Sequence, residues 1–403
     1  MERIKKVGNR IFALLFVLAL LAFSGANFLQ TRELLKTEAA PLDPAEISKG
    51  IAELNAVLEE NVLGRYQMLE GYGRIQKLLD KHEENAFVNV IDKAGYLYSG
   101  NFWNGFGDDQ KELAVRVRRL SDFLKERGVP LGFVLEPSKT VRAEERYAGI
   151  PYDDFTTEAD DMLRWLRYYG VPYLDLRESM ERSGLDYDEM WFKTDHHWTP
   201  PAAFEGYRAL VSWMNEVFGA GLDPDGVDRD LDHYDVVTYP DAMLGSQGRE
   251  TGLAYAGGME DYTAVAPKAE GSYVWISNDA PMRSGAFREA FLKEDILGMD
   301  PYHLNAGAFY LNELTVYSRL INRQAPNDKK ILLLRDSFAT PVGAFLAQDC
   351  ARVDMLWNIE YTADDLRAYL EENDLDYVII MLYPQNLSNG SFPFFQTAGQ
   401  EDL

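Results

Sequence analysis

The chain has 403 residues, of which 46% are hydrophobic and 13% aromatic, so it can bury a sizeable globular core. Its formal net charge of −25 argues against nucleic-acid binding, because phosphate contacts require a basic face. The single cysteine, Cys350, excludes an intramolecular disulfide and is expected to be a small buried hydrophobe.

Residues 1–36 are predicted to form a targeting segment. A basic flank at 3–10 precedes an uncharged apolar run at 11–28, and about 18 residues is the lower limit for a helix that spans a bilayer. The basic flank predicts a cytoplasmic N-terminus and an exported remainder. We interpret the segment as an uncleaved signal anchor in the cell membrane. Cleavage at Ser24-Gly25-Ala26 is the alternative and would give a secreted protein.

Residues 37–84 are interpreted as a helical stalk or lead-in to the main domain. Pro41 and Pro44 break the first helix, and residues 45–82 then carry apolar residues at helical spacing, such as Ile51, Leu54 and Leu58.

From residue 85 to the C-terminus the sequence alternates between short apolar segments and amphipathic ones. Strands are expected at 87–91, 96–98, 130–136, 171–176, 272–277, 330–334, 352–356 and 376–382. Helices are expected at 109–126, 157–169, 200–218, 314–321, 341–347 and 364–372. Continuous apolar strands separated by helices predict an α/β domain over 85–403, with a parallel sheet covered on both faces. An irregular insertion is expected around 221–305.

The most informative motif is Asp195-His196-His197-Trp198, which contains two of the five histidines. Histidine is the side chain that titrates nearest neutral pH. In an extended segment, residues two apart point the same way, so Asp195 can orient His197 as a general base. His196 is then expected to point away and to be structural. The alternative is that both histidines are only packed residues.

The candidate nucleophile is Ser337, in the segment Arg335-Asp336-Ser337-Phe338 directly after an expected buried strand. Ligands of open α/β sheets bind beyond the carboxyl ends of the strands. The N–H groups at the start of a following helix can stabilise an oxyanion there. The Gly-x-Ser-x-Gly elbow is absent. The alternative is that Ser337 caps the helix and Asp336 is a loop residue.

Five further residues are candidates for substrate or oxyanion binding. Lys139 follows an expected strand and could bind a carboxylate or polarise a carbonyl; a solvated lysine is the alternative. In the glycine-bearing loop 244–249, Gly245 could supply an oxyanion N–H and Arg249 could hold an anionic group. Tyr383 and Asn386 follow the last expected strand and are expected to line the same cleft.

The sequence Asp195-His196-His197 is also compatible with the metal site of a metal-dependent hydrolase. Adjacent imidazoles would point apart in an extended strand, and the chain has no cysteine cluster. We therefore expect no metal and no cofactor.

The constellation resembles the DHHW protein family and the alginate O-acetyltransferase proteins, which have SGNH-hydrolase-like domains. Besides Asp195-His196-His197-Trp198, the resemblance is carried by Pro137-Ser138-Lys139 and by segments 173–176, 244–257 and 331–338. It extends over much of 85–390. It implies an SGNH-hydrolase-like fold in which Ser337, His197 and Asp195 form a catalytic triad. The family's usual Gly-Asp-Ser motif is Arg335-Asp336-Ser337 in this chain. The resemblance also implies an oxyanion glycine and an oxyanion asparagine, for which Gly245 and Asn386 are the candidates.

The resulting hypothesis is an extracytoplasmic O-acetyltransferase or acetylesterase that acts on a cell-surface or secreted polysaccharide through an acyl-Ser337 intermediate. A membrane anchor suits a partner membrane protein that delivers acyl groups. The alternative is a non-catalytic glycan-binding or assembly protein of the cell envelope with a degenerate site. A Ser337–His197 separation of roughly 2.6–3.2 Å would support catalysis, and one beyond about 8 Å would favour the alternative.

Overall fold

The computed structural model describes residues 2–38, 55, 58–100, 109–140, 155–278, 281–312, 315–357 and 363–387. The chain divides into two compact units, residues 1–76 and 77–403. Residues 39–54, 56 and 57 of the expected lead-in lie outside the described residues.

The N-terminal unit contains one long helix, α1 (Glu2–Glu38), and most of helix α3 (Arg65–Leu78). Within α1, the segment Val7–Leu34 contains an 18-residue window with a mean hydropathy of 2.3 and is long and apolar enough to cross a membrane, by length and composition. The side chain of Asn27 accepts a hydrogen bond of 2.7 Å from the Leu63 N–H. The expected N-terminal apolar helix is therefore present and is a candidate membrane span.

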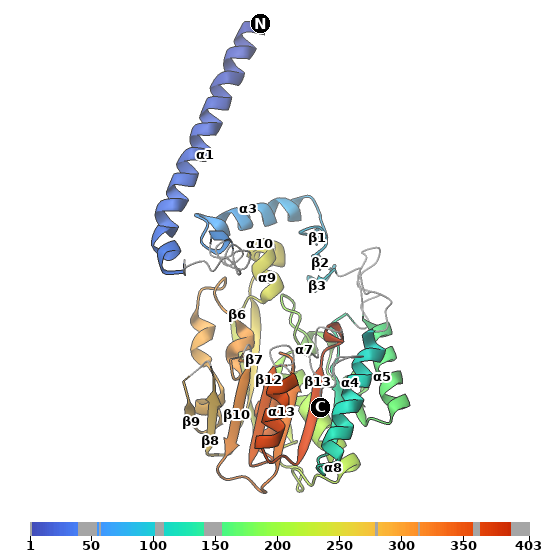
Figure 1. Cartoon of the computed structure of the whole chain (residues 1–403). Coiled ribbons are helices and arrows are strands. Elements are labelled where there is room, and N and C mark those ends of the chain that lie inside the picture. Colours follow the sequence, from blue (N-terminus) through green and yellow to red (C-terminus); the bar gives the residue numbers. More distant parts are fainter. Residues whose placement is uncertain are drawn as a thin grey trace. The chain divides into compact units, whose positions relative to one another are not determined.

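The second unit is built on an eight-stranded sheet (Figure 1) with the order β5-β4-β13-β11-β12-β10-β8-β9. Its first five strands are parallel: β5 (Tyr173–Asp175), β4 (Leu131–Leu135), β13 (Tyr377–Leu382), β11 (Lys330–Arg335) and β12 (Arg352–Trp357). The last three are antiparallel: β10 (Tyr317–Asn322), β8 (Tyr273–Ser277) and β9 (Arg283–Gly285).

Alternate side chains of the central strands enter two different hydrophobic cores. On β11, Ile331 and Leu333 face one core, whereas Leu332 and Leu334 face the other. The first core is covered by helices α6 (Leu176–Ser183), α8 (Pro200–Phe218) and α12 (Ala339–Leu346). The second is covered by α4 (Asp109–Lys125), α5 (Thr156–Tyr169) and α13 (Ala363–Glu372).

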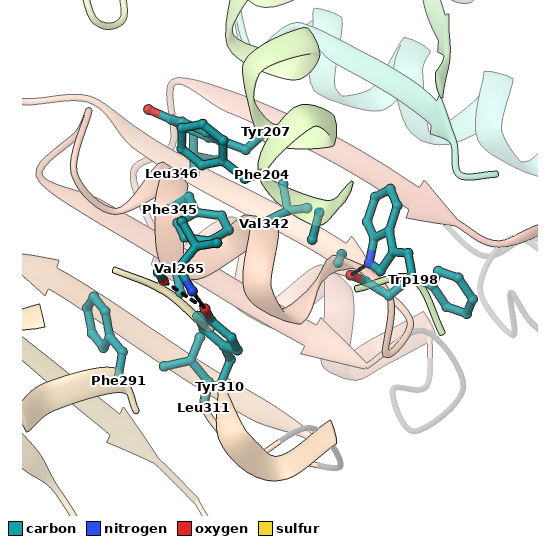
Figure 2. Packing of buried hydrophobic residues seen from close by; sticks show 14 of the residues in the cluster. Trp198, Phe204, Tyr207, Val265, Phe291, Tyr310, Leu311, Val342, Phe345 and Leu346 are labelled. Carbon is teal, nitrogen blue, oxygen red and sulfur yellow. Dashed lines mark hydrogen bonds between the residues drawn. The ribbon is translucent and has the colours of Figure 1, made fainter. Parts of the chain in front are cut away.

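Aromatic side chains fill the first core where α8 meets α12. The ring centroid of Phe345 on α12 lies 5.3 Å from that of Phe204 and 5.8 Å from that of Tyr207, both on α8. Figure 2 shows these rings together with Tyr310, whose hydroxyl donates to the Val265 carbonyl at 2.7 Å. Pairs of this kind contribute about 0.5–1.5 kcal/mol beyond their buried area. They lock together the two helices that begin nearest the candidate site.

Smaller elements surround the sheet. They comprise a three-stranded sheet of β1 (Glu83–Glu84), β2 (Asn89–Ile91) and β3 (Leu97–Ser99), the hairpin β6 (Tyr234–Met243) with β7 (Glu260–Pro267), and four short helices, α7 (Tyr187–Met190), α9 (Ser246–Thr251), α10 (Leu253–Ala256) and α11 (Phe287–Phe291). Within the expected insertion at 221–305, β8 and β9 are strands of the main sheet.

The expected fold class is confirmed, with two differences. The sheet is mixed, because three antiparallel strands extend the five parallel ones. The prediction of a helix at 314–321 is wrong, because Tyr317–Asn322 is strand β10. The residues of this strand alternate between partly buried and buried. Ser318 and Asn322 occupy buried positions of this strand, so polar side chains hid the two-residue period; Ser318 is satisfied by the Trp275 indole N–H at 2.9 Å.

We predict that Gly132→Ala destabilises the second unit, because a Cβ at this position of β4 would lie 2.4 Å from the Trp213 indole of α8. Overpacking of this kind costs about 1–3 kcal/mol in the free energy of unfolding. The control is Gly298→Ala, where nothing lies within 4 Å and the change should stay within about 0.5 kcal/mol. Denaturant unfolding of both variants is the measurement, and equal losses would contradict the packing argument.

Candidate active site

The site lies at the carboxyl ends of three neighbouring parallel strands. Glu136 directly follows β4, Asp336 and Ser337 follow β11, and Tyr383 follows β13. The backbone ladder continues past the strand ends, since the Glu136 N–H donates to Leu382 and the Asp336 N–H to Met381. This is the edge at which open α/β sheets bind ligands.

The structure brings Ser337, His197 and Asp195 into one hydrogen-bonded chain. The Nε2 atom of His197 lies 2.7 Å from the Ser337 hydroxyl, and its Nδ1 atom lies 2.6 Å from Asp195 Oδ1. Because a carboxylate faces Nδ1, the proton of a neutral ring belongs there, which leaves Nε2 as the acceptor toward Ser337. The separation falls within hydrogen-bond reach, although the residues are 140 positions apart.

The acid–base loop differs from the expected extended segment. Residues 193–197 form a bend, in which Asp195 Oδ1 also accepts the backbone N–H of His197 at 3.0 Å. The two imidazole rings therefore lie side by side, with centroids 3.9 Å apart. The expectation that His196 points away is wrong, because the carboxylate satisfies both the backbone and the ring of His197 and so turns the chain.

Asp195 is buried and ionised. Burial by itself would raise the pKa of its carboxyl group, but the charges of His197 and His196 hold that pKa well below its usual range. The backbone N–H of Ser246 contributes by donating to Oδ2 at 2.7 Å. At neutral pH a negative charge therefore stands behind the Nδ1 atom of His197.

Lys139 supports the backbone of the acid–base loop from within. It is only 3% exposed, and its ammonium group donates to the carbonyls of Leu97, Lys193 and Asp195 at 2.6, 3.1 and 2.7 Å. The expected contact of Lys139 with substrate is corrected accordingly: its ammonium group is used to hold the peptide carbonyls around Asp195.

The glycine-bearing loop also holds the acid–base loop. The N–H of Gly245 donates to Thr194 Oγ1 at 2.7 Å, so it is not directed at Ser337 as an oxyanion donor would be. A Cβ at Gly245 would lie 2.4 Å from both Asp195 Cβ and the Thr194 carbonyl, which explains the glycine. Arg249 donates to the Leu244 carbonyl at 3.1 Å and to that of Leu304. Its expected role in holding an anionic group is likewise replaced by a contact with the backbone.

Asp336 shapes the turn that presents Ser337. Its Oδ1 accepts from the Phe338 N–H at 3.1 Å, and its Oδ2 accepts from the Tyr383 N–H and the Asn386 amide, both at 2.8 Å. The Tyr383 ring stacks on Phe338, with centroids 4.4 Å apart. Tyr383 and Asn386 therefore lie at the site as expected, and the Asn386 amide supports the nucleophile turn.

Trp198 joins the two halves of the site. Its indole N–H donates to the Phe338 carbonyl at 3.0 Å, which links the acid–base loop to the nucleophile turn (Figure 2). The tryptophan is only 3% exposed. Within the motif, His197 contacts Ser337 directly. Trp198 instead fixes the distance between the acid–base loop and the nucleophile turn.

Glu136 is a site residue that sequence reasoning did not single out. It is fully buried, and neither of its carboxyl oxygens meets a hydrogen-bond donor in the described part of the chain. Burial raises the pKa of Glu136 well above its usual value, and the charge of Asp336 adds to this effect. Glu136 therefore carries a buried proton behind the nucleophile turn. Its position after an apolar strand was the only available signal.

A small cavity adjoins the reactive atoms. It has a volume of about 40 Å³ and is bounded by Asp195, His197 and Ser337. The remaining lining is mostly apolar and aromatic, from Phe192, Trp198, Pro200, Met243, Tyr262, Gly307, Tyr310, Phe338 and Pro341.

Asp195, His196 and His197 also have ligand atoms within 4.8 Å of one another, a spacing that could hold a metal ion. However, the two ring nitrogens of His197 face Asp195 and Ser337. The arrangement of these donors fits proton transfer between a hydroxyl and an imidazole better than it fits metal ligation.

Residues 105–228 match the family model described as the SGNH hydrolase-like domain of the acetyltransferase AlgX. The structure is similar to that of PatB1 from Bacillus cereus, with 22% identity and a TM-score of 0.63 over 76% of this chain and 99% of that one. A PatB1 structure with a sulfonyl adduct matches at 21% identity and a TM-score of 0.61, over 76% of this chain and 97% of that one. A DHHW family protein from Eubacterium siraeum matches with 14% identity and a TM-score of 0.53, over 75% of this chain and 91% of that one. No curated protein matches the sequence.

These matches confirm the predicted resemblance to SGNH-hydrolase-like and DHHW proteins. The structural likenesses show a shared fold, and the family match over 105–228 supports an O-acetyltransferase kind of role. The matched region contains Asp195 and His197 and ends before Ser337.

We predict that the buried proton of Glu136 makes wild-type stability fall with rising pH. The folded state keeps this proton above about pH 4.5, where the unfolded chain loses it, so stability declines until the pH reaches the folded pKa. Glu136→Gln has no proton to lose and keeps nearly the same side-chain volume. The free energy of unfolding of the variant, minus that of wild type, should therefore increase from pH 5 to 9.

The matched control is Glu216→Gln at an exposed position of α8. Its difference from wild type should not change over the same interval. A pH-independent difference for Glu136→Gln as well would contradict a buried proton at this position.

Proposed function

We propose that residues 85–403 form an acyl-ester enzyme, an O-acetyltransferase or acetylesterase that works through an acyl-Ser337 intermediate. The observation that carries this proposal is the continuous chain Asp195–His197–Ser337, with contacts of 2.6 and 2.7 Å. Nucleophile, base and orienting carboxylate in mutual hydrogen-bond reach are the usual requirement for acyl transfer by serine.

In the first half-reaction, Ser337 Oγ attacks the carbonyl carbon of the donor ester. Its proton passes to His197 Nε2, and the carbonyl oxygen becomes negatively charged. Asp195 stabilises the imidazolium that results. Collapse of the tetrahedral intermediate breaks the bond to the leaving oxygen, which takes the proton from His197. The acyl group then remains esterified to Ser337.

In the second half-reaction, an acceptor hydroxyl or water attacks the acyl-serine. His197 removes the acceptor's proton and returns it to Ser337 Oγ as the ester bond breaks. A carbohydrate hydroxyl as acceptor gives O-acetylation, and water gives hydrolysis. The same residues serve both outcomes, so the acceptor that reaches the site determines the reaction.

The oxyanion donor that we propose is the backbone N–H of Ser337 itself. Across the described ranges, this N–H donates no hydrogen bond. It lies two residues before α12, and the N–H groups near a helix N-terminus can stabilise a developing negative charge. This assignment replaces Gly245, whose N–H is used by Thr194.

The cavity beside Ser337 supports a short acyl group. A water-sized group needs about 10–15 Å³ of such volume, so the observed 40 Å³ has room for roughly three of them. An acetyl group has three heavy atoms. The apolar lining suits its methyl group, and a long acyl chain would meet the rings of Tyr262 and Tyr310.

We further propose that α1 is a signal anchor with its N-terminus in the cytoplasm, so that the enzyme domain is extracytoplasmic. The span Val7–Leu34 and the preceding basic residues support this orientation. The acceptor is then a cell-surface or secreted polysaccharide, and a membrane protein that supplies acyl groups is the fitting partner.

We predict that Ser337→Ala abolishes acyl transfer. The full chain in detergent should release p-nitrophenol from its acetate ester and should be labelled by a fluorophosphonate or sulfonyl fluoride at Ser337. The variant should lose both signals, because it lacks the hydroxyl that lies in hydrogen-bond contact with His197 Nε2. The control is Ser284→Ala at an exposed position of β9, which should retain both.

Hydrolysis that survives in Ser337→Ala would overturn the proposed mechanism. Absence of both signals in wild type, together with retained glycan binding, would favour the non-catalytic cell-envelope module.

We also predict that Asp195→Asn lowers kcat by about 10²–10⁴-fold with little change in KM, because the neutral amide no longer stabilises the His197 imidazolium. Steady-state kinetics on the acetate ester is the measurement. Asp235→Asn on the exposed face of β6 serves as the charge-matched control and should match wild type. A kcat within threefold of wild type for Asp195→Asn would exclude this role for the carboxylate.

A further inference from the structure

We propose that Asp223, Asp228 and Asp349 form a binding site for a divalent cation, with calcium as the favoured ion. The cluster lies at the far end of the two helices that begin at the candidate active site. α8 starts at Pro200, just after Trp198, and its C-terminal loop carries Asp223 and Asp228. α12 starts two residues after Ser337, and Asp349 lies three residues past its end.

The three carboxyl groups converge from two distant parts of the chain. Each offers one oxygen atom, and these atoms lie within 4.8 Å of one another. Calcium binds oxygen at 2.3–2.6 Å, so two ligands on opposite sides of the ion are separated by roughly 4.6–5.2 Å. The observed spacing allows all three carboxylates to share one calcium ion. It requires no movement of the loop toward α12.

A second observation points to a ligand at this place. The side chain of Asp349 is 0% exposed, and its Oδ1 atom meets no hydrogen-bond donor in the described part of the chain. Its other oxygen accepts the Tyr207 hydroxyl at 2.7 Å. An acceptor that is buried without a donor is costly, and such groups usually have a water, proton or ion as partner. One oxygen of this carboxyl group lies within 4.8 Å of a carboxylate oxygen of both Asp223 and Asp228.

The local charge also favours a divalent cation. The only basic side chain that pairs with these carboxylates within the described residues is Arg229, whose Nε donates to Asp223 Oδ2 at 2.8 Å. Three carboxylates and one guanidinium have a formal charge of −2, which a calcium ion would neutralise.

Bound calcium would fasten the loop after α8 to the end of α12. Oxygen-rich sites of low ligand number complete their six to eight ligands with water, and extracellular modules bind calcium with Kd values of about 10⁻⁴–10⁻³ M. Magnesium demands a tighter octahedron and keeps its water more strongly, so it should bind more weakly. The predicted effect of calcium is therefore stabilisation of the domain and not participation in acyl chemistry.

The test uses the full chain in detergent after treatment with EGTA. Titration with CaCl2 should show one site with a Kd of about 0.1–1 mM and should raise the melting temperature. TbCl3 should give luminescence on excitation of tyrosine, since Tyr207 contacts Asp349 directly, and CaCl2 should displace that signal.

Asp228→Asn and the control Asp225→Asn remove the same charge from the same loop, but Asp225 is exposed and outside the cluster. Asp225→Asn should respond to calcium as wild type does. Asp228→Asn should bind at least tenfold more weakly and lose the calcium-dependent rise in melting temperature. Asp349→Asn should do the same; if it does not fold, the Asp228 and Asp225 variants decide the matter.

A wild-type protein that binds neither ion, or an Asp228→Asn variant with unchanged calcium response, would overturn the proposal. The first result would leave a water or a proton as the partner of Asp349 Oδ1. Both readouts are independent of acyl transfer, so failure of the proposed enzymatic function leaves this test intact.

Discussion

The carboxylate of Asp195 is the interaction on which the candidate site depends. It accepts hydrogen bonds from the backbone and ring of His197 and from the Ser246 N–H, all within 3.0 Å. One buried charge thus bends the loop, orients the imidazole toward Ser337 and anchors the glycine-bearing segment. Its neighbours Lys139 and Gly245 act on the same loop, the first through the Asp195 carbonyl and the second through close approach of its backbone.

The nucleophile turn is organised in a parallel way around a second carboxylate, Asp336. Asp195 stays ionised beside two histidines, whereas Asp336 faces the protonated Glu136 and three N–H donors. The two carboxyl groups have different roles because their surroundings differ. Asp195 supports a developing positive charge, and Asp336 fixes a backbone turn. Trp198 joins the two arrangements through the Phe338 carbonyl, so the distance between base and nucleophile is set by buried contacts.

Local patterns in the sequence predicted most of the fold because they have local causes. The helix at 200–218 begins with two prolines and ends at Gly219, and the structure has these bounds. The apolar run of β11 was equally clear. Strand β10 was missed, since its buried positions carry Ser318 and Asn322, whose partners come from elsewhere in the chain. The nucleophile and base candidates followed from motif chemistry, whereas the roles of Lys139, Gly245 and Arg249 depended on contacts between segments.

The sequence by itself determined which residues are candidates for chemistry, because proton affinity and nucleophilicity belong to side-chain type. It also determined the alternation of strands and helices, because burial imposes their periods. Only the tertiary structure decided that Ser337 and His197 lie 2.7 Å apart, that the two histidine rings lie side by side, and that Glu136 stands behind Asp336. The cluster of Asp223, Asp228 and Asp349 likewise appears only in space. Distances between residues far apart in sequence are set by packing of the whole sheet and its helices, which no local pattern contains.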